Sequence, residues 1–218
     1  MIACLKWWIS VYKDYGAANQ QLERVRTELL NSAILVVGTV GSGSEKMVPM
    51  STIQTFLNTR GVGAHIPTDG PLPPNLLPLS ISRNFDPQLL SSALGWRELT
   101  VLDWLRHIET AAASNPEFDP TKSPEFADRL LNTLARALPS VPKATVEAAV
   151  QILQSKSCIP TTMGLKLPQE SYFQTAHIFS DLPIVKLPSN APIKGNLEKI
   201  LLALGVRKHV DLQIVFDR

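Results

Sequence analysis

Cysteine is scarce in this sequence of 218 residues, in which only Cys4 and Cys158 occur. Two cysteines cannot build the dense disulfide framework that stabilises small secreted domains. A chain of this length can also bury a sizeable core without such crosslinks. We therefore expect an intracellular protein, cytoplasmic or nuclear, that folds by hydrophobic burial.

Long apolar runs are missing as well. No uninterrupted apolar stretch approaches the ~20 residues that are needed to cross a bilayer. The apolar start, MIACLKWWIS, lacks a basic region, and Lys6 and Lys13 interrupt it before any cleavage site of a signal peptide. We expect no membrane association, and we interpret the N-terminus as that of a fragment or an alternative start.

A strong charge of one sign is also lacking. The formal net charge is only +2, with 18% charged and 44% hydrophobic residues, which is ordinary for a globular protein. So small a net charge does not by itself indicate a surface for nucleic acid or anionic lipid.

Catalytic constellations are the last absence. The four histidines, at positions 65, 107, 177 and 209, and the two cysteines have no metal-ligand spacing, and no serine lies in a nucleophile-elbow pattern. His65 and Asp69 are close in sequence, but without a nucleophile a loop histidine is the better interpretation. The sequence therefore predicts a protein that is not an enzyme and that needs no cofactor or metal.

The glycine-rich stretch from Gly38 to Lys46 is the feature that most resembles a ligand loop. Gly38 and Gly43 have the spacing of a phosphate-binding loop, but Ser44-Glu45 follow where lysine and a hydroxyl residue are required. We interpret the stretch as a flexible linker.

Helical periodicity recurs along most of the chain. It predicts one or two helices over residues 4–30 with a break at Gly16, and further helices over 51–60, 86–95, 100–108, 123–138, 144–153 and 196–204. Ser51, Asp86 and Asn196 have the side chains of N-caps. Residues 33–37 predict a short buried strand, and the proline-rich residues 61–78 predict an extended path over the surface.

The stretch from Ala144 to Phe173 organises the prediction of the fold. A helix over 144–153 is followed by a strand ending at Pro160, a turn at Thr162-Met163-Gly164, and a returning strand from Leu165 that continues to Tyr172-Phe173. This order is typical of a winged-helix-like unit, and also of a generic α+β fragment. We predict an α+β fold, predominantly helical, with small β-hairpins, divided into residues 1–44, 45–122 and 123–218.

Several phrases of the sequence resemble a known family. They are FLNTRGVGAHIPTDGPLP, ALGWRELTVLDWLRHI, CIPTTMGLKLPQESYF, DLPIVKLPS and KGNLEKILLALGVRKHVDLQIVFDR. Over residues 48–218 the chain resembles a segment of very large uncharacterised fungal proteins related to sacsin and to the plant Nov proteins. The resemblance implies a region outside the heat-shock-protein-90-type ATPase-like domain of that family, so that no nucleotide-binding residues carry over.

Two classes of function follow. The first is a non-catalytic structural or protein-interaction module, a scaffold that binds protein partners or other domains of the same large protein, or self-associates. Its candidate interaction surface is His65, Pro67, Asp69, Lys156, Lys166, Arg207 and Lys208. The alternative is a nucleic-acid-binding winged-helix module in which Lys156, Lys166, Lys194, Lys199, Arg207 and Lys208 contact phosphates. The cations are scattered, which disfavours nucleic acid. Residues 206–218 fit a helix or a strand and end on an apolar element.

Overall fold

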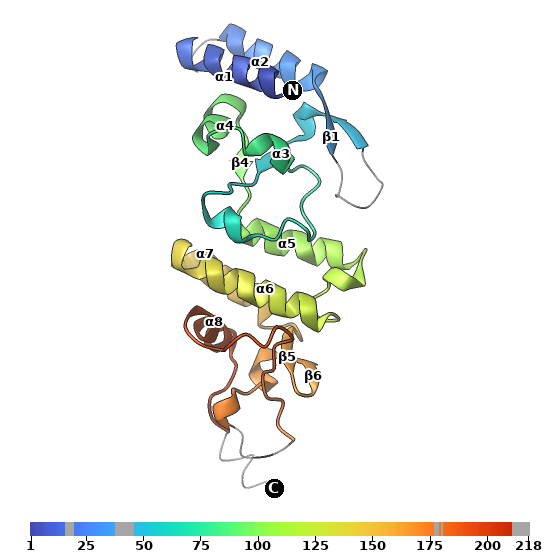
Figure 1. Cartoon of the computed structure of the whole chain (residues 1–218), viewed down its shortest axis with the longest axis vertical. Helices are drawn as coiled ribbons and strands as arrows, with labels where there is room; N and C mark the ends of the chain where they lie inside the picture. The colour runs from blue at the N-terminus through green and yellow to red at the C-terminus, as the bar shows by residue number, and fades with distance from the viewer. Residues whose placement is uncertain (16–19, 38–45, 177–178, 180, 211–218) are drawn as a thin grey trace. The chain divides into compact units, whose positions relative to one another are not determined.

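The computed structural model describes residues 1–15, 20–37, 46–176, 179 and 181–210 (Figure 1). The predicted linker from Gly38 lies outside these residues except for Lys46, and so do His177 and most of the C-terminal segment. Eight α-helices and three strand pairs occur in the described part of the chain. The prediction of a predominantly helical α+β fold is confirmed.

The chain divides into two compact units. Unit 1 contains residues 1–64 and 72–100, and unit 2 contains residues 65–71 and 101–218. The short segment 65–71, called the strap below, therefore belongs to unit 2 although both of its flanks belong to unit 1. The predicted divisions after residues 44 and 122 stay predictions.

Unit 1 begins with two helices and a hairpin. Its elements are α1 (Ile2–Tyr15), α2 (Gln20–Ser32), β1 (Ile34–Val37), β2 (Lys46–Pro49), a 3₁₀ turn (Met50–Thr52), β3 (Thr55–Phe56), a 3₁₀ turn (Val62–His65) whose last residue belongs to the strap, α3 (Leu79–Ser82), α4 (Pro87–Leu94) and β4 (Arg97–Glu98). They surround one core cluster of Leu5, Trp8, Ile9, Met50, Ile53, Phe56, Leu77, Leu90, Ala93, Leu94 and Trp96.

Several local predictions in unit 1 are confirmed. Asp86 caps α4 by accepting a hydrogen bond from the Gln88 amide at 2.8 Å, and the helix ends at Gly95, whose φ of 72° is left-handed. The predicted N-terminal helical region is present as α1 and α2, whereas the predicted break at Gly16 lies outside the described residues. The strand at Ile34 is also present, but the predicted burial is wrong at Ile34, which is 57% exposed.

The predicted helix over residues 51–60 is wrong. The chain makes one 3₁₀ turn and then extends as β3, which pairs in parallel with β4. The Thr55 and Phe56 carbonyls accept from the Leu77 and Leu99 amides, both at 2.8 Å, so distant partners satisfy this backbone. The proline-rich stretch is likewise not wholly on the surface, because Leu77 is fully buried.

Unit 2 is built around α6. Its elements are α5 (Val101–Ala112), 3₁₀ turns (Pro116–Phe118 and Leu138–Ser140), α6 (Pro124–Ala137), α7 (Lys143–Leu153), β5 (Ile159–Thr161), β6 (Gly164–Lys166), 3₁₀ turns (Pro168–Glu170 and Gln174–Ala176) and α8 (Asn196–Leu204). The buried stripe of α6 packs against α8 and β5. The Ser123 hydroxyl accepts from the Phe126 amide at 3.2 Å, which fixes the start of α6.

The predicted helix and hairpin of the organising stretch are present as α7, β5 and β6. Gly164 closes the turn with a φ of 84°. The predicted continuation to Tyr172 is interrupted by a 3₁₀ turn, after which Tyr172 bridges Ile184 and Arg207 in parallel. One further detail is corrected: Gly195, rather than Asn196, is the N-cap of α8, and Asn196 is the first helical residue.

Membrane insertion has no support among the helices that the structure describes. None of them combines the length and the apolar character that a membrane span requires.

Candidate functional site

The seven predicted interaction residues fall in several places in unit 2. His65, Pro67 and Asp69 lie on the strap, Lys156 follows α7, and Lys166 ends β6. Arg207 and Lys208 follow α8, where they lie over the rings of Tyr172 and Phe173 at 5.9 and 6.0 Å from the ring centres. Whether these residues form one interaction surface stays a prediction.

The strap is fixed by polar contacts to two helices of its own unit. The buried Trp104 indole on α5 donates to the Pro71 carbonyl at 3.1 Å. Asp69 forms an ion pair with Arg129 on α6. Asp69 is therefore the partner of an arginine 60 residues later, which no local sequence pattern indicates.

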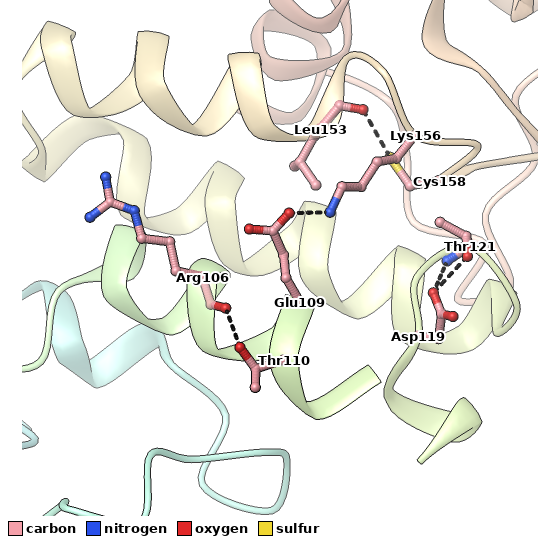
Figure 2. Close-up of polar contacts among 8 residues, drawn as sticks. All are labelled: Arg106, Glu109, Thr110, Asp119, Thr121, Leu153, Lys156 and Cys158. Carbon is pink, nitrogen blue, oxygen red and sulfur yellow. Dashed lines mark hydrogen bonds and ion pairs between the residues drawn. The ribbon is translucent and has the colours of Figure 1, made fainter. Parts of the chain in front are cut away.

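A cleft of about 490 Å³ lies in unit 2 between the end of α5, the loop 119–122 and the end of α7. Glu109 of α5 and Lys156 form an ion pair across it, as Figure 2 shows. The two side chains are 42% and 27% exposed, respectively, so solvent screens the pair only in part. Lys156 was found by sequence reasoning, whereas Glu109, 47 residues earlier, was not.

The Asp119 carboxylate also lines the cleft. Burial raises the pKa of this carboxyl, but hydrogen bonds from the Thr121 side chain and backbone and from Lys122 outweigh burial and hold the pKa below its ordinary value. The Thr121 hydroxyl and amide lie 2.6 and 2.9 Å from one carboxylate oxygen, and Lys122 Nζ lies 3.1 Å from the other. The Asp119 carboxylate thus stabilises the loop 119–122, to which it belongs, through contacts with Thr121 and Lys122; Figure 2 shows those with Thr121.

Cys158 lies beside the cleft but has no reactive character. Its side chain is fully buried, and burial raises the pKa of the thiol to about 12. The thiol donates weakly to the Leu153 carbonyl at 3.7 Å. Because the thiolate is the nucleophilic form, this cysteine is protonated and inert at neutral pH.

The two acidic side chains of the cleft are therefore paired with lysines and are not arranged as catalytic groups. Glu109 and Asp119 each contact a lysine, and the neighbouring Arg106 guanidinium is directed away from Glu109 (Figure 2). Among the residues that the structure describes, no three histidine, cysteine or acidic side chains are grouped as metal ligands. That the protein is not an enzyme stays a prediction.

Two of the cations proposed for phosphate binding are already paired. Lys156 contacts Glu109, and Lys208 contacts Glu198 at 2.7 Å. A phosphate would have to compete with a carboxylate at each of these positions, which lowers the free energy that nucleic-acid binding gains from them.

Comparison with known proteins gives a family but no activity. No curated protein and no solved structure matches the chain. A family model described as protein of unknown function, DUF3684, matches residues 1–218. Because this match extends over the whole sequence, the chain belongs to the DUF3684 family.

Proposed function

We propose that the chain is a non-catalytic module that associates with protein surfaces, including that of a second copy of itself, within a large protein of the kind related to sacsin. The observation that carries the proposal is the distribution of exposed apolar side chains. Eight large hydrophobic residues are exposed in the described part of the chain. Six of them lie within the first 47 residues: Met1, Trp7, Tyr15, Val25, Ile34 and Met47.

Helix α1 has exposed aromatic side chains in addition to its buried apolar stripe. Leu5, Trp8 and Ile9 are buried in the core of unit 1, whereas Trp7 and Tyr15 are 55% and 71% exposed. Residues 7 and 15 are eight positions apart, about 80° around the helix axis at 3.6 residues per turn, so the two exposed rings lie beside the buried stripe without sharing one line along the helix. Tryptophan and tyrosine are among the side chains most enriched at the centre of protein interfaces.

The hairpin has a similar apolar face. In the β1–β2 register Ile34 pairs with Pro49, and Met47 lies two residues before Pro49 on the same face of β2. All three side chains are exposed or partly exposed, while Val48 on the opposite face packs against the core. Single exposed apolar residues are normal, but this concentration in one part of unit 1 favours an interaction surface.

Sedimentation velocity of the whole chain tests the proposal. We expect concentration-dependent association at tens of micromolar, which the double substitution Trp7→Glu and Tyr15→Glu abolishes by placing charges in the contact. Met163→Glu and Leu202→Glu are matched controls, because these exposed residues lie in unit 2 and are expected to have no effect. A wild-type chain that is strictly monomeric would contradict the proposal.

The nucleic-acid alternative is tested by fluorescence anisotropy with labelled duplex DNA. A salt-dependent increase that Lys166→Glu reduces would support the alternative. The protein-association proposal expects no binding at ordinary ionic strength.

A further inference from the structure

A groove in unit 2 consists of two adjacent hollows of about 490 and 390 Å³. Both hollows are lined by Lys186, Leu187 and Asn190, so this short segment forms the ridge between them. We call it the Lys186–Asn190 groove. Its lining residues differ from those of the cleft that contains Lys156.

A buried carboxylate holds the ridge in place. Asp128 on α6 is 4% exposed, and it accepts hydrogen bonds from the Ser189 amide at 2.7 Å and from the Asn132 side chain at 2.6 Å. Asn190 has a left-handed φ of 52°, and its amide donates to the Leu187 carbonyl at 2.9 Å. Asparagine tolerates this conformation better than most residues. The turn at residues 187–190 is therefore held in place by the buried Asp128 carboxylate.

The ridge has polar groups that the fold does not use. The Asn190 side chain is exposed and makes no hydrogen bond with any described residue, so its amide is available as both donor and acceptor. Lys186 is exposed too, and it forms no ion pair within the described chain. Its backbone amide donates to the Pro160 carbonyl at 2.9 Å, which fixes the position of the residue.

The electrostatic balance of the groove is positive. Among the residues that the structure describes, Lys186, Lys208 and Glu198 are the charged residues that line the two hollows, and Glu198 is already paired with Lys208. The second hollow has no carboxylate among its described lining residues. An anionic group near Lys186 would meet a cation that forms no ion pair with the described residues.

The remaining lining suits an extended polypeptide. Pro160, Pro188 and Pro192 provide apolar walls without amide donors, and Leu187 lies between the hollows. Proteins that bind extended peptides can take up alternate side chains in pockets while polar groups bond to the peptide backbone. We propose that the Lys186–Asn190 groove binds an extended acidic peptide segment, with a carboxylate paired to Lys186 and a peptide group bonded to the Asn190 amide. This rests on the proposed function in that the partner is a polypeptide, but it uses a surface in unit 2.

The test uses the whole chain and three labelled octapeptides of alternating residues, (Glu-Val)4, (Gln-Val)4 and (Lys-Val)4. Fluorescence anisotropy at low and moderate salt gives the affinities. We expect (Glu-Val)4 to bind at least about fivefold more tightly than (Gln-Val)4, and (Lys-Val)4 not to bind. Added salt should weaken the binding of the acidic peptide. Equal affinities for the first two peptides, or no binding, would overturn the proposal.

Two variants locate the binding. Lys186→Glu should weaken (Glu-Val)4 about tenfold, whereas Lys143→Glu, the same charge change at an exposed residue of α7 outside the groove, should leave affinity unchanged. Asn190→Gly relieves the left-handed backbone, so it should keep the fold while weakening the peptide about threefold to tenfold. Equal effects at positions 143 and 186 would refute the site. The Trp7 and Tyr15 variants report on association separately, so either proposal can fail alone.

Discussion

Replacing Asp128 with alanine should destabilise unit 2 more than replacing any exposed carboxylate of that unit. The Asp128 carboxylate is almost fully buried and accepts from the Ser189 amide and the Asn132 side chain. A hydrogen bond to a charged acceptor contributes about 1.5–3 kcal/mol, and a donor left unpaired in the interior has a cost of similar size. Two such bonds give an expected loss of about 3 kcal/mol, which is a large part of the stability of a typical domain.

Urea unfolding followed by circular dichroism measures this loss. With a slope of roughly 2–3 kcal/mol per molar urea, the midpoint of Asp128→Ala should fall by about 1 M. Asp128→Asn keeps one acceptor oxygen, so about half of the loss is expected. Glu125→Ala, which removes a carboxylate near the start of α6 that is not buried, is the control and should change stability by less than about 0.5 kcal/mol. A cost below about 1 kcal/mol for Asp128→Ala would refute the reasoning.

Three further predictions concern other groups. In the native chain a disulfide reagent at about pH 8 should modify Cys4, which is partly exposed. It should modify Cys158 only after denaturant is added, because the pKa of the Cys158 thiol is raised to about 12. Rapid modification of both thiols in the native wild type would be inconsistent with this. The pKa of Asp119 is lowered in the fold, so its contribution to stability is present above the unfolded value of 3.8 and is lost as the pH falls through the lower folded value. The difference in unfolding free energy between wild type and Asp119→Asn should therefore be largest near neutral pH and shrink below about pH 4. A difference that grows on acidification would reverse the assigned sign. Trp8→Phe removes the 2.8 Å hydrogen bond from the indole to the Ala93 carbonyl together with buried volume, so it should lower the free energy of unfolding by about 1–3 kcal/mol in thermal or urea unfolding. The exposed Trp7→Phe should lower it by less than about 0.5 kcal/mol. Equal losses at the two positions would show that the buried and the exposed tryptophan are wrongly assigned.

Local signals predicted those elements whose ends are set by neighbouring residues. Asp86 and Gly95 mark both ends of α4, and Gly164 marks the turn of the β5–β6 hairpin, because a cap or a left-handed glycine acts on residues close to it in sequence. The helix over 51–60 failed for the opposite reason. Buried residues at 53, 56 and 57 fit one turn of helix as well as a short extended segment, and the choice depends on a pairing of β3 with the distant strand β4.

The polar contacts that define the sites were beyond sequence reasoning for the same physical reason. Lys156 was predicted to contact a partner or phosphates, but its ion pair with Glu109, which comes from another helix, was not predicted. Asp69 was placed with His65 in one candidate interaction surface, but its ion pair with Arg129 was not predicted. The groove depends on Asp128 and Ser189, which are 61 residues apart and have no motif in common. Such contacts follow from packing of the helices, and periodicity gives only the face that each helix buries.

The strap has a consequence for how the chain can be divided. The Pro71 carbonyl and the Asp69 carboxylate, which contact α5 and α6, come earlier in the chain than either helix. A truncated product that starts at Val101 would leave the Trp104 indole without its acceptor and Arg129 without its counterion. Residues 65–71, in the first half of the sequence, thus encode part of the fold of the second half, and separating the two halves at residue 100 removes them from the unit in which they pack.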